Sequence, residues 1–204
     1  MRVLWLTLGI VIADQVSKLL VRGLTFDPLS IAWPGLPYGV SRPVIGDIVR
    51  LTYIENPGMA FGIELGGKSW FAIVSIVASI AILLYLYKVR NERFGFRVAL
   101  GLILGGALGN LVDRVFYGVL FDQAPLFYGK VVDFIDVDFF NINLGFYHFH
   151  RWPVFNIADA CVTIGVILVF IFHRTAVASS RQALAERTSA TGHAEAGEAQ
   201  ASKE

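Results

Sequence analysis

The chain is poor in charged residues and in cysteine. Only 16% of its 204 residues are charged, whereas soluble domains carry about 25%, and 55% are hydrophobic. This balance favours a membrane protein over a soluble one. The formal net charge is only +1, so there is no basic surplus with which to bind a nucleic acid. The single cysteine, Cys161, excludes an internal disulfide and is interpreted as a small buried apolar side chain.

The sequence also lacks common motifs of catalysis and metal binding. It contains neither the H-E-x-x-H motif of zinc peptidases nor the G-x-S-x-G motif of serine hydrolases. His148 and His150 would share one face of a strand, but no Cys or third His lies nearby to complete a metal site. We therefore predict no metal site, and carboxylates remain as the candidates for chemistry.

Four apolar segments approach the length of a membrane-spanning helix, which needs about 20 mostly apolar residues. They comprise residues 3–22, 70–87, 98–112 and 154–172. The third ends near Asp113 and Arg114. We predict an all-α membrane protein with four transmembrane helices and a small β-rich region in its extracytoplasmic loops.

The Lys and Arg residues of the loops predict the orientation in the membrane. Residues 88–97 are rich in them, whereas the longer segments 25–69 and 118–153 hold few. We therefore predict that both termini and residues 88–97 are cytoplasmic. The two long segments would lie outside, which in a bacterium means the periplasm or the outer face of the cytoplasmic (inner) membrane.

The outer segments differ in composition from the C-terminal region. Residues 48–54 alternate loosely between apolar and polar and contain β-formers, so we predict a strand, then a turn at Asn56-Pro57-Gly58. A short sheet on the outer membrane surface would result, and the aromatic residues of 118–153 suit the interfacial zone. Residues 175–204 are mostly small and polar. We expect them to form a disordered cytoplasmic tail after a membrane domain of residues 1–174.

A carboxylate, Asp159, lies inside the fourth apolar segment. At a bilayer centre such a group costs at least about 2.5–3.5 kcal/mol, so it usually has a partner and a function. Its position after Pro153 corresponds to roughly 9 Å along a helix, which places it near the outer surface. Asn156 shares its helix face.

Three carboxylates that follow the third apolar segment could face Asp159, namely Asp133, Asp136 and Asp138. The residues alone do not choose among them. Two carboxyl groups that face each other in a partly dry site do not both ionise readily, so one keeps a proton. Such a pair can act on a water molecule as base and acid, as in aspartic peptidases.

The first apolar segment contains a pair of opposite charges. Asp14 and Lys18 share one helix face and are interpreted as an ion pair that neutralises both and ties the helix to its neighbours. They also interrupt the apolar run that follows Arg2, and no small-x-small cleavage site closes it. We therefore expect a retained helix and not a cleaved signal peptide.

The third apolar segment combines glycines with a polar end. Gly101, Gly105 and Gly109 recur at four-residue spacing, which lets another helix approach closely. Asn110 and Arg114 then share a face at the end of the segment. They would either orient a polar substrate or a carboxylate, or cap the helix.

Five motifs follow one another along residues 1–174. They are Asp14-Gln15-Val16-Ser17-Lys18, Asn56-Pro57-Gly58-Met59-Ala60-Phe61-Gly62, Gly105-Gly106-Ala107-Leu108-Gly109-Asn110-Leu111-Val112-Asp113-Arg114, Val131-Val132-Asp133-Phe134 and Phe155-Asn156-Ile157-Ala158-Asp159. Each alone is a weak signal. All five in this order resemble the lipoprotein signal peptidase (signal peptidase II) family of bacterial membrane aspartic peptidases.

This resemblance implies an activity and a set of roles. The family removes the signal peptide of prolipoproteins, cleaving just before a cysteine that carries diacylglycerol, and uses neither a metal nor an organic cofactor. The implied catalytic pair is Asp133 and Asp159. The positions implied to line the site and hold the substrate or the catalytic groups are Asn56, Asn110, Arg114 and Asn156. The implied supporting positions are Asp14, Lys18 and Asp113.

The implied partners are diacylglyceryl-modified prolipoproteins and membrane lipids, and we expect a monomer. We expect the loop of residues 56–62 to close over the site and exclude water. Residues 117–130 and 136–152 look longer than in compact members of the family. These two segments would change the rim of the site, not its motifs.

Two other functions compete with a peptidase. A small proton-coupled transporter or channel would use Asp14 and Asp159 as parts of a proton path. It explains the charges within apolar segments, but not the additional carboxylate outside the third one. A non-catalytic membrane scaffold explains the glycine spacing and nothing else.

Overall fold

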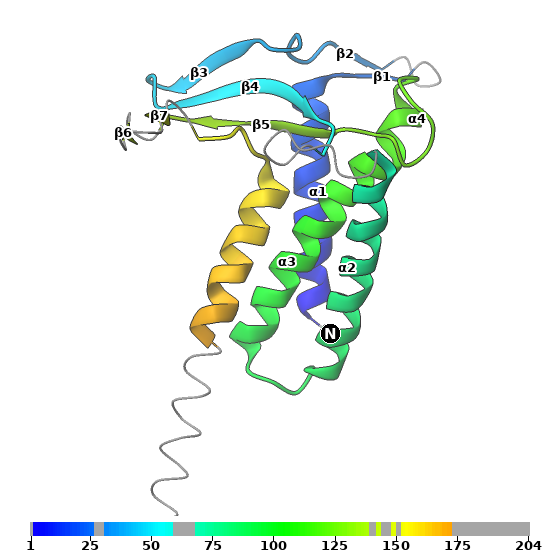
Figure 1. The fold of residues 1–204 in the computed structure, drawn as a ribbon, viewed down its shortest axis with the longest axis vertical. Helices are drawn as coiled ribbons and strands as arrows, with labels where there is room; N and C mark the ends of the chain where they lie inside the picture. The colour runs from blue at the N-terminus through cyan, green and yellow to red at the C-terminus, as the bar shows by residue number, and fades with distance from the viewer. Residues whose placement is uncertain are drawn as a thin grey trace, which may run out of the picture.

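The computed structural model describes residues 2–26, 31–58, 68–138, 142–143, 148–149 and 152–172. Within them, long helices run side by side and strands lie across one end of the bundle (Figure 1). The predicted tail and most of the loop of residues 56–62 lie outside the described residues. The predicted combination of membrane helices and small sheets is confirmed for the described part of the chain.

Three helical segments of the described chain are long and apolar enough to cross a membrane. They are α1 (Val3–Arg22), α2 (Lys68–Lys88) and the continuous segment Phe94–Leu120, which consists of α3 (Phe94–Val112), the π-helical turn η2 (Asp113–Tyr117) and α4 (Gly118–Leu120). A fourth apolar helix, Ile157–Phe172, is shorter. It is the unlabelled yellow-to-orange helix of Figure 1 and is called the last helix below.

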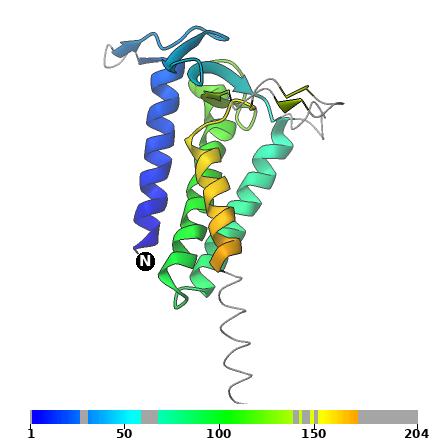
Figure 2. The same ribbon diagram turned by 90° about the vertical axis from the view of Figure 1, so that its left-hand side faces the viewer.

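The glycines of α3 allow two neighbours to pack closely, as their spacing predicted. A Cβ atom at Gly105 would lie 2.9 Å from Ile10 of α1, and one at Gly109 would lie 2.6 Å from the Asp14 carboxylate. Gly106 lies against the backbone carbonyl of Ala158 in the last helix. Because α3 also contacts α2, it occupies the centre of the bundle (Figure 2).

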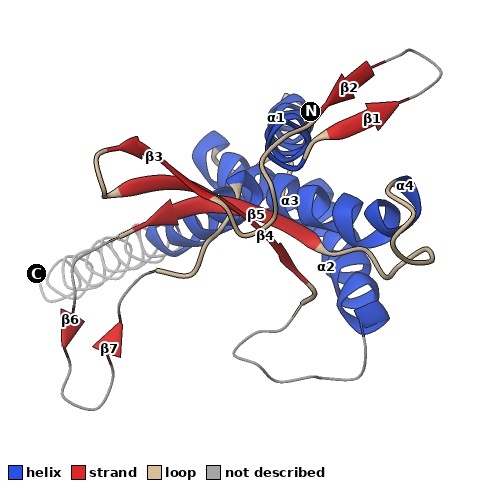
Figure 3. Ribbon diagram, turned by 90° about the horizontal axis from the view of Figure 1, so that it is seen from above, coloured by secondary structure: helices blue, strands red, loops and turns tan. Residues whose placement is uncertain are grey.

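The main sheet has three antiparallel strands in the order β3-β4-β5. These strands are β3 (Ser41–Ile45), β4 (Val49–Asn56) and β5 (Val131–Val137). The two short hairpins are β1 (Leu24–Phe26) with β2 (Ile31–Trp33), and β6 (Ile142–Asn143) with β7 (His148–Phe149). Seen from above, β4 and β5 pass over the end of the bundle (Figure 3).

Strand pairing determines which side chains share a face of this sheet. Glu55 lies opposite Val132, and Ile54 lies opposite Asp133. Because neighbouring residues of a strand point to opposite faces, Asp133 and Val132 lie on different faces. Val132 joins an apolar cluster that fastens the sheet to the helices, which comprises Val21, Tyr53, Tyr117, Val132 and Phe134.

Three predicted helix limits were wrong. The third helix begins at Phe94 and not at Val98. The third helix does not end near Asp113 and Arg114, because it continues through η2 and α4 to Leu120. The last helix begins at Ile157 and not at Val154. Phe155 instead exchanges backbone hydrogen bonds with Ile135 of β5 (2.7 and 3.0 Å), so these residues extend the sheet before the helix can start.

Candidate active site

Asp159 lies in the first turn of the last helix. Its backbone N–H donates to Asn156 Oδ1 (2.9 Å), and the Asn156 N–H donates to Asp159 Oδ2 (3.3 Å). This reciprocal pair is the arrangement of a capping box, with Asn156 as the N-cap. The expected depth of about 9 Å below Pro153 was therefore too large, since residues 153–156 are not helical. A carboxylate at a helix N-terminus is also stabilised by the helix dipole.

Asp133 projects from β5 and is almost completely buried, with 2% of its surface exposed. Its Oδ1 accepts a hydrogen bond from the Asn156 side chain (2.7 Å), and Asn56 also donates to the carboxyl group. Burial, followed by the negative charge of Asp159, raises the pKa of Asp133 to about 7, although the two amide donors oppose this shift. Asp133 can therefore hold a proton near neutral pH.

Two asparagine side chains connect the two carboxyl groups. Asn110 of α3 donates to Asp159 Oδ1 (2.7 Å). The Asn156 amide, which binds Asp133, also donates to Asn110 Oδ1 (3.0 Å). Because these contacts come from a strand and two helices, the relative position of Asp133 and Asp159 depends on how those elements pack.

A buried lysine lies behind this pair. Lys18 Nζ contacts Asp14 Oδ2 (2.8 Å), Asp113 Oδ2 (2.9 Å) and Asn110 Oδ1 (2.8 Å). The side chains of Lys18, Asp14 and Asp113 have no exposed surface. Three acceptors satisfy the three N–H donors of an ammonium group. The predicted Asp14–Lys18 ion pair is confirmed, and it extends to α3 through Asp113.

The two carboxylates on Lys18 also hold the backbone next to the catalytic candidates. Asp14 Oδ1 accepts the N–H of Ala158, the residue before Asp159 (3.0 Å). Asp113 Oδ2 accepts the N–H of Val132, the residue before Asp133 (3.1 Å). Asp14 is therefore engaged in an ion pair and a helix-terminal contact, which suits a positioning role better than a place in a proton path.

Asp113 and Arg114 belong to the π-helical turn, a feature often found at functional sites. Asp113 points to α1, while Arg114 Nη1 contacts Ser75 Oγ of α2 (3.4 Å) and the Asn110 carbonyl (3.5 Å). The Arg114 guanidinium is also close enough to the carboxyl groups of Asp133 and Asp159 to interact with them electrostatically. Arg114 thus lies near the carboxyl pair from the side of α2.

Sequence reasoning did not assign site roles to Gln15 and Tyr117. Gln15 Nε2 donates to Asp113 Oδ1 (2.8 Å) and to the Gly109 carbonyl (3.0 Å), and Tyr117 donates its hydroxyl to Gln15 Oε1 (3.0 Å). The presence of a Gln within an apolar helix was the available signal for the first. Nothing in the sequence indicated that Tyr117 reaches α1.

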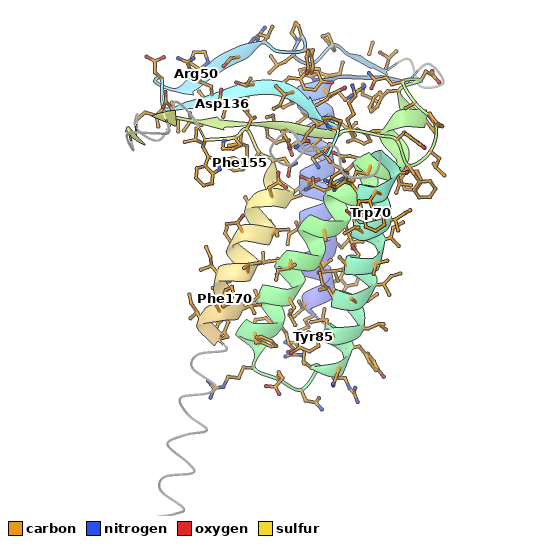
Figure 4. The ribbon with its side chains drawn as sticks, in the orientation of Figure 1. Arg50, Trp70, Tyr85, Asp136, Phe155 and Phe170 are labelled. Carbon is orange, nitrogen blue, oxygen red and sulfur yellow. The ribbon has the colours of Figure 1, made fainter. Side chains whose placement is uncertain are left out.

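The three carboxylates considered as partners of Asp159 have different surroundings. Asp138 follows β5, and its backbone N–H donates to the Ile48 carbonyl (2.8 Å). Asp133 joins the amide network described above. Asp136 accepts a hydrogen bond from Thr52 (2.6 Å) and pairs across the sheet with Arg50 (Figure 4).

Among the described residues, no group of three or more His, Cys, Asp or Glu side chains could hold a metal ion.

A buried and a half-buried carboxyl group, joined by amides at the end of a bundle of apolar helices, form the arrangement expected of a membrane aspartic peptidase. The family model described as signal peptidase (SPase) II matches residues 6–174. The chain belongs to the signal peptidase II family and is a peptidase, which confirms the resemblance read from its five motifs. A transporter or channel is not favoured.

Similar proteins match most of the chain. The lipoprotein signal peptidase of Desulfitobacterium hafniense is 39% identical over 171 residues, covering 82% of this chain and 90% of that protein. That of Chlorobaculum parvum is 36% identical over 168 residues, covering 82% and 92%. A solved structure described as a bacterial membrane enzyme has a TM-score of 0.65 at 31% identity and covers 87% of this chain and 90% of its own.

Proposed function

We propose that this protein is a membrane-embedded aspartic endopeptidase that removes the signal peptide from diacylglyceryl-modified prolipoproteins, cleaving before the lipidated cysteine. The relatives named lipoprotein signal peptidase support this substrate class. The observation that carries the proposal is the pair Asp133 and Asp159, which two asparagine amides hold in one network.

In the proposed reaction the two carboxyl groups act on one water molecule. Asp159 accepts a proton from the water, whose oxygen attacks the scissile carbonyl carbon. Asp133, protonated near neutral pH because its pKa is raised to about 7, donates its proton to the developing oxyanion. The carbon–nitrogen bond then breaks as the leaving amine takes the proton from Asp159. One hydroxyl group of the tetrahedral intermediate gives its proton to Asp133 as the carboxyl product forms, so both Asp residues return to their starting states.

The other polar residues hold this pair and the substrate in position. Asn110 and Asn156 keep the two carboxyl groups in register. Asn56 accepts the Gly58 N–H at its Oδ1 (2.9 Å), which aims its amide at Asp133. Arg114 would bind a carbonyl of the substrate chain. Asp14, Lys18 and Asp113 act through the backbone that they hold.

The membrane placement that we propose has four spans, with the sheet and the active site at the periplasmic face and both termini in the cytoplasm. The start of α1 and the α2–α3 link lie at the same end of the bundle, opposite the sheet (Figure 1). That link contains Arg90 and Arg93, in agreement with the distribution expected of cytoplasmic loops. Trp70 and Tyr85 project from opposite ends of α2 (Figure 4), as interfacial aromatic residues do.

The test is cleavage of a diacylglyceryl-modified precursor by the purified full-length protein, compared with the unlipidated precursor. We expect only the lipidated form to be cleaved. Asp133→Asn and Asp159→Asn should each abolish cleavage without loss of the folded protein. Asp47→Asn is the control, because the Asp47 side chain is 91% exposed and lies in a turn of the sheet. Near wild-type cleavage by either dyad variant would refute the assignment.

The loop that follows Asn56 is proposed to cover the bound substrate. Its residues 59–62 lie outside the described part of the chain, so the proposal is supported by the way in which the loop leaves β4. Asn56, the last residue of β4, contacts Asp133, and Gly58 turns the chain with a positive φ of 96°. Shortening the loop after Gly58 should lower kcat. An unchanged kcat would remove the loop from the mechanism.

A further inference from the structure

Two cavities adjoin at the sheet end of α1, and their linings differ in polarity. One, of about 400 Å³, is lined by Arg22, Thr25, Trp33, Phe121 and Asp122, among others. The other, of about 300 Å³, is lined by Val16, Leu19, Leu20, Leu24 and Trp33. Trp33 and Leu24 line both, so a charged chamber continues into an apolar groove along the side of α1.

The walls of the chamber are held by close backbone contacts. Gly23 (φ 93°) and Gly35 (φ 62°) cross so tightly that a Cβ atom on either would overlap the other segment's backbone. The Leu36 N–H donates to the Val21 carbonyl (2.7 Å). The Trp33 indole N–H donates to the Leu20 carbonyl (2.7 Å), one of the carbonyls that the helix end leaves without a helical partner. The indole ring therefore stands between the two cavities.

Opposite charges face the chamber. Arg22 uses its Nε to bind Glu55 Oε1 (3.3 Å), and its guanidinium lies 3.4 Å from the centre of the Phe121 ring. Burial opposes ionisation of Glu55, yet hydrogen bonds from Tyr53 and Lys130 with nearby positive charges keep its pKa below the usual value. Glu55 therefore stays ionised and binds the guanidinium at its Nε, so an anion in the chamber would be bound through the terminal N–H groups of Arg22. Asp122 supplies an exposed carboxylate to the same chamber.

We propose that this composite site binds a membrane phospholipid with a zwitterionic, primary-amine headgroup. Arg22 binds its phosphate, Asp122 binds its ammonium group, and an acyl chain follows Val16 and Leu20 along the groove. The site lies where the apolar span Val3–Arg22 ends, which is the depth of lipid headgroups, and an indole ring is favoured there. A purely anionic headgroup would meet repulsion from Asp122.

The site is separate from the catalytic pair and does not depend on the proposed reaction. Arg22 reaches the sheet through Glu55, which shares a face with Val132. Asp133 lies on the opposite face of that sheet because it is the next residue along β5. A lipid in the chamber would fix the end of α1 without occupying the space between the two catalytic carboxyl groups.

Lipid retention by the full-length protein, measured by native mass spectrometry, tests the proposal. The probes are phosphatidylethanolamine, phosphatidylcholine and phosphatidylglycerol with identical acyl chains. We expect phosphatidylethanolamine to be retained about threefold to fivefold more than phosphatidylglycerol, the upper range for one exposed ion pair. Retention of phosphatidylcholine should lie between those of the other two lipids, because its headgroup carries the positive charge but no N–H donor.

Asp122→Asn should abolish the preference for phosphatidylethanolamine, and Trp33→Ala should lower retention of all three lipids. The controls are Asp47→Asn, at another exposed carboxylate, and Trp5→Ala, at an exposed indole on the first turn of α1. No preference in the wild type, or a preference that survives Asp122→Asn, would overturn the proposal. So would displacement of bound phosphatidylethanolamine by a diacylglyceryl-modified precursor, because the site would then serve the substrate's own lipid.

Discussion

Asp133 and Asp159 differ in their surroundings, and this difference is the basis for the roles that we propose for them. Asp133 is buried on a strand and receives amide donors from Asn156 and Asn56. Asp159 is half-buried at a helix N-terminus and accepts N–H donors at both of its oxygens. We therefore propose that Asp133 is the protonated acid and Asp159 the base.

The rate of cleavage should fall as the pH rises through about 7, because Asp133 then loses the proton that it must donate. The raised pKa also lowers the free energy of unfolding as pH rises from about 4 to 7. Over that range the folded protein retains a proton that the unfolded chain has released. The pH profile of kcat for a lipidated precursor measures the first effect. A rate that stays level from pH 6 to 9 would contradict the assignment.

Lys18→Met should lower the free energy of unfolding by about 3–5 kcal/mol, because it leaves Asp14 and Asp113 buried without their counter-charge. Thermal unfolding in a fixed detergent and lipid mixture measures the change. Lys130→Met is the matched control, since the Lys130 side chain is partly exposed and pairs with Glu55 of β4. Equal losses for the two variants would show that the buried network adds no special stability.

Asn156 has two separable functions, and substitution can tell them apart. Asn156→Ser keeps an oxygen to cap the last helix but has no amide to donate to Asp133. We expect stability close to that of the wild type and a kcat lower by roughly two orders of magnitude. Asn156→Ala should lose the cap as well, at a cost of about 1 kcal/mol in unfolding free energy. Equal kcat for Asn156→Ser and the wild type would show that the amide is dispensable.

At the scale of elements, α3 connects the parts of the site. One side of the helix receives α1 through Gly105 and Gly109, and another receives the last helix at Gly106. Its π-helical turn lets the chain continue past Asp113 and Arg114, so that Asp113 reaches α1 while Arg114 faces α2. The close packing of α3 therefore sets the distance between Asp159 and the strand that carries Asp133.

Gly106→Ala should displace the last helix, because the new Cβ atom would overlap the Ala158 carbonyl. We expect a lower unfolding temperature and at least a tenfold loss of kcat/KM, since Ala158 precedes Asp159 and small displacements at reacting groups are costly. Gly9→Ala is the control, because nothing lies within 4 Å of a Cβ atom there. It should keep full activity and gain stability from better helix propensity. A fully active Gly106→Ala protein would refute this account of the packing.

At the scale of the whole molecule, the helices form the membrane part and the sheet covers one end of it (Figures 1 and 2). The contacts that build the site all lie between Asp14 and Asp159. The family match ends at residue 174. The proposed membrane domain of residues 1–174 should therefore carry the complete activity.

A chain that stops after residue 174 should cleave a lipidated precursor at the rate of the full-length protein. It should also behave as a monomer, as we propose for the 22.5 kDa full-length chain. Cleavage assays and light scattering of the purified protein in detergent measure the two properties. A large loss of cleavage in the shortened chain would assign a function to residues 175–204, and a dimer mass would refute the proposed monomer.

The sequence by itself determined the apolar helices, the close glycine packing, the ion pair of Asp14 with Lys18 and the five family motifs. These features are local, since they depend on hydrophobic periodicity and on residues a few positions apart. The predicted strand at residues 48–54 was also found, as β4 (Val49–Asn56), which begins one residue and ends two residues later, because its β-formers lie in one continuous run.

Only the tertiary structure decided how Asp133 is connected to Asp159. The two are separated along the chain and meet through amides of Asn110 and Asn156, which no local pattern encodes. β5 was not predicted, because its carboxylates interrupt an apolar run and its pairing with β4 is non-local. Asp159 proved to be a residue of the first helical turn, because Phe155 pairs with β5 before the helix begins. The free-energy cost of placing this carboxylate in an apolar helix is therefore offset by the helix cap and by packing between distant segments.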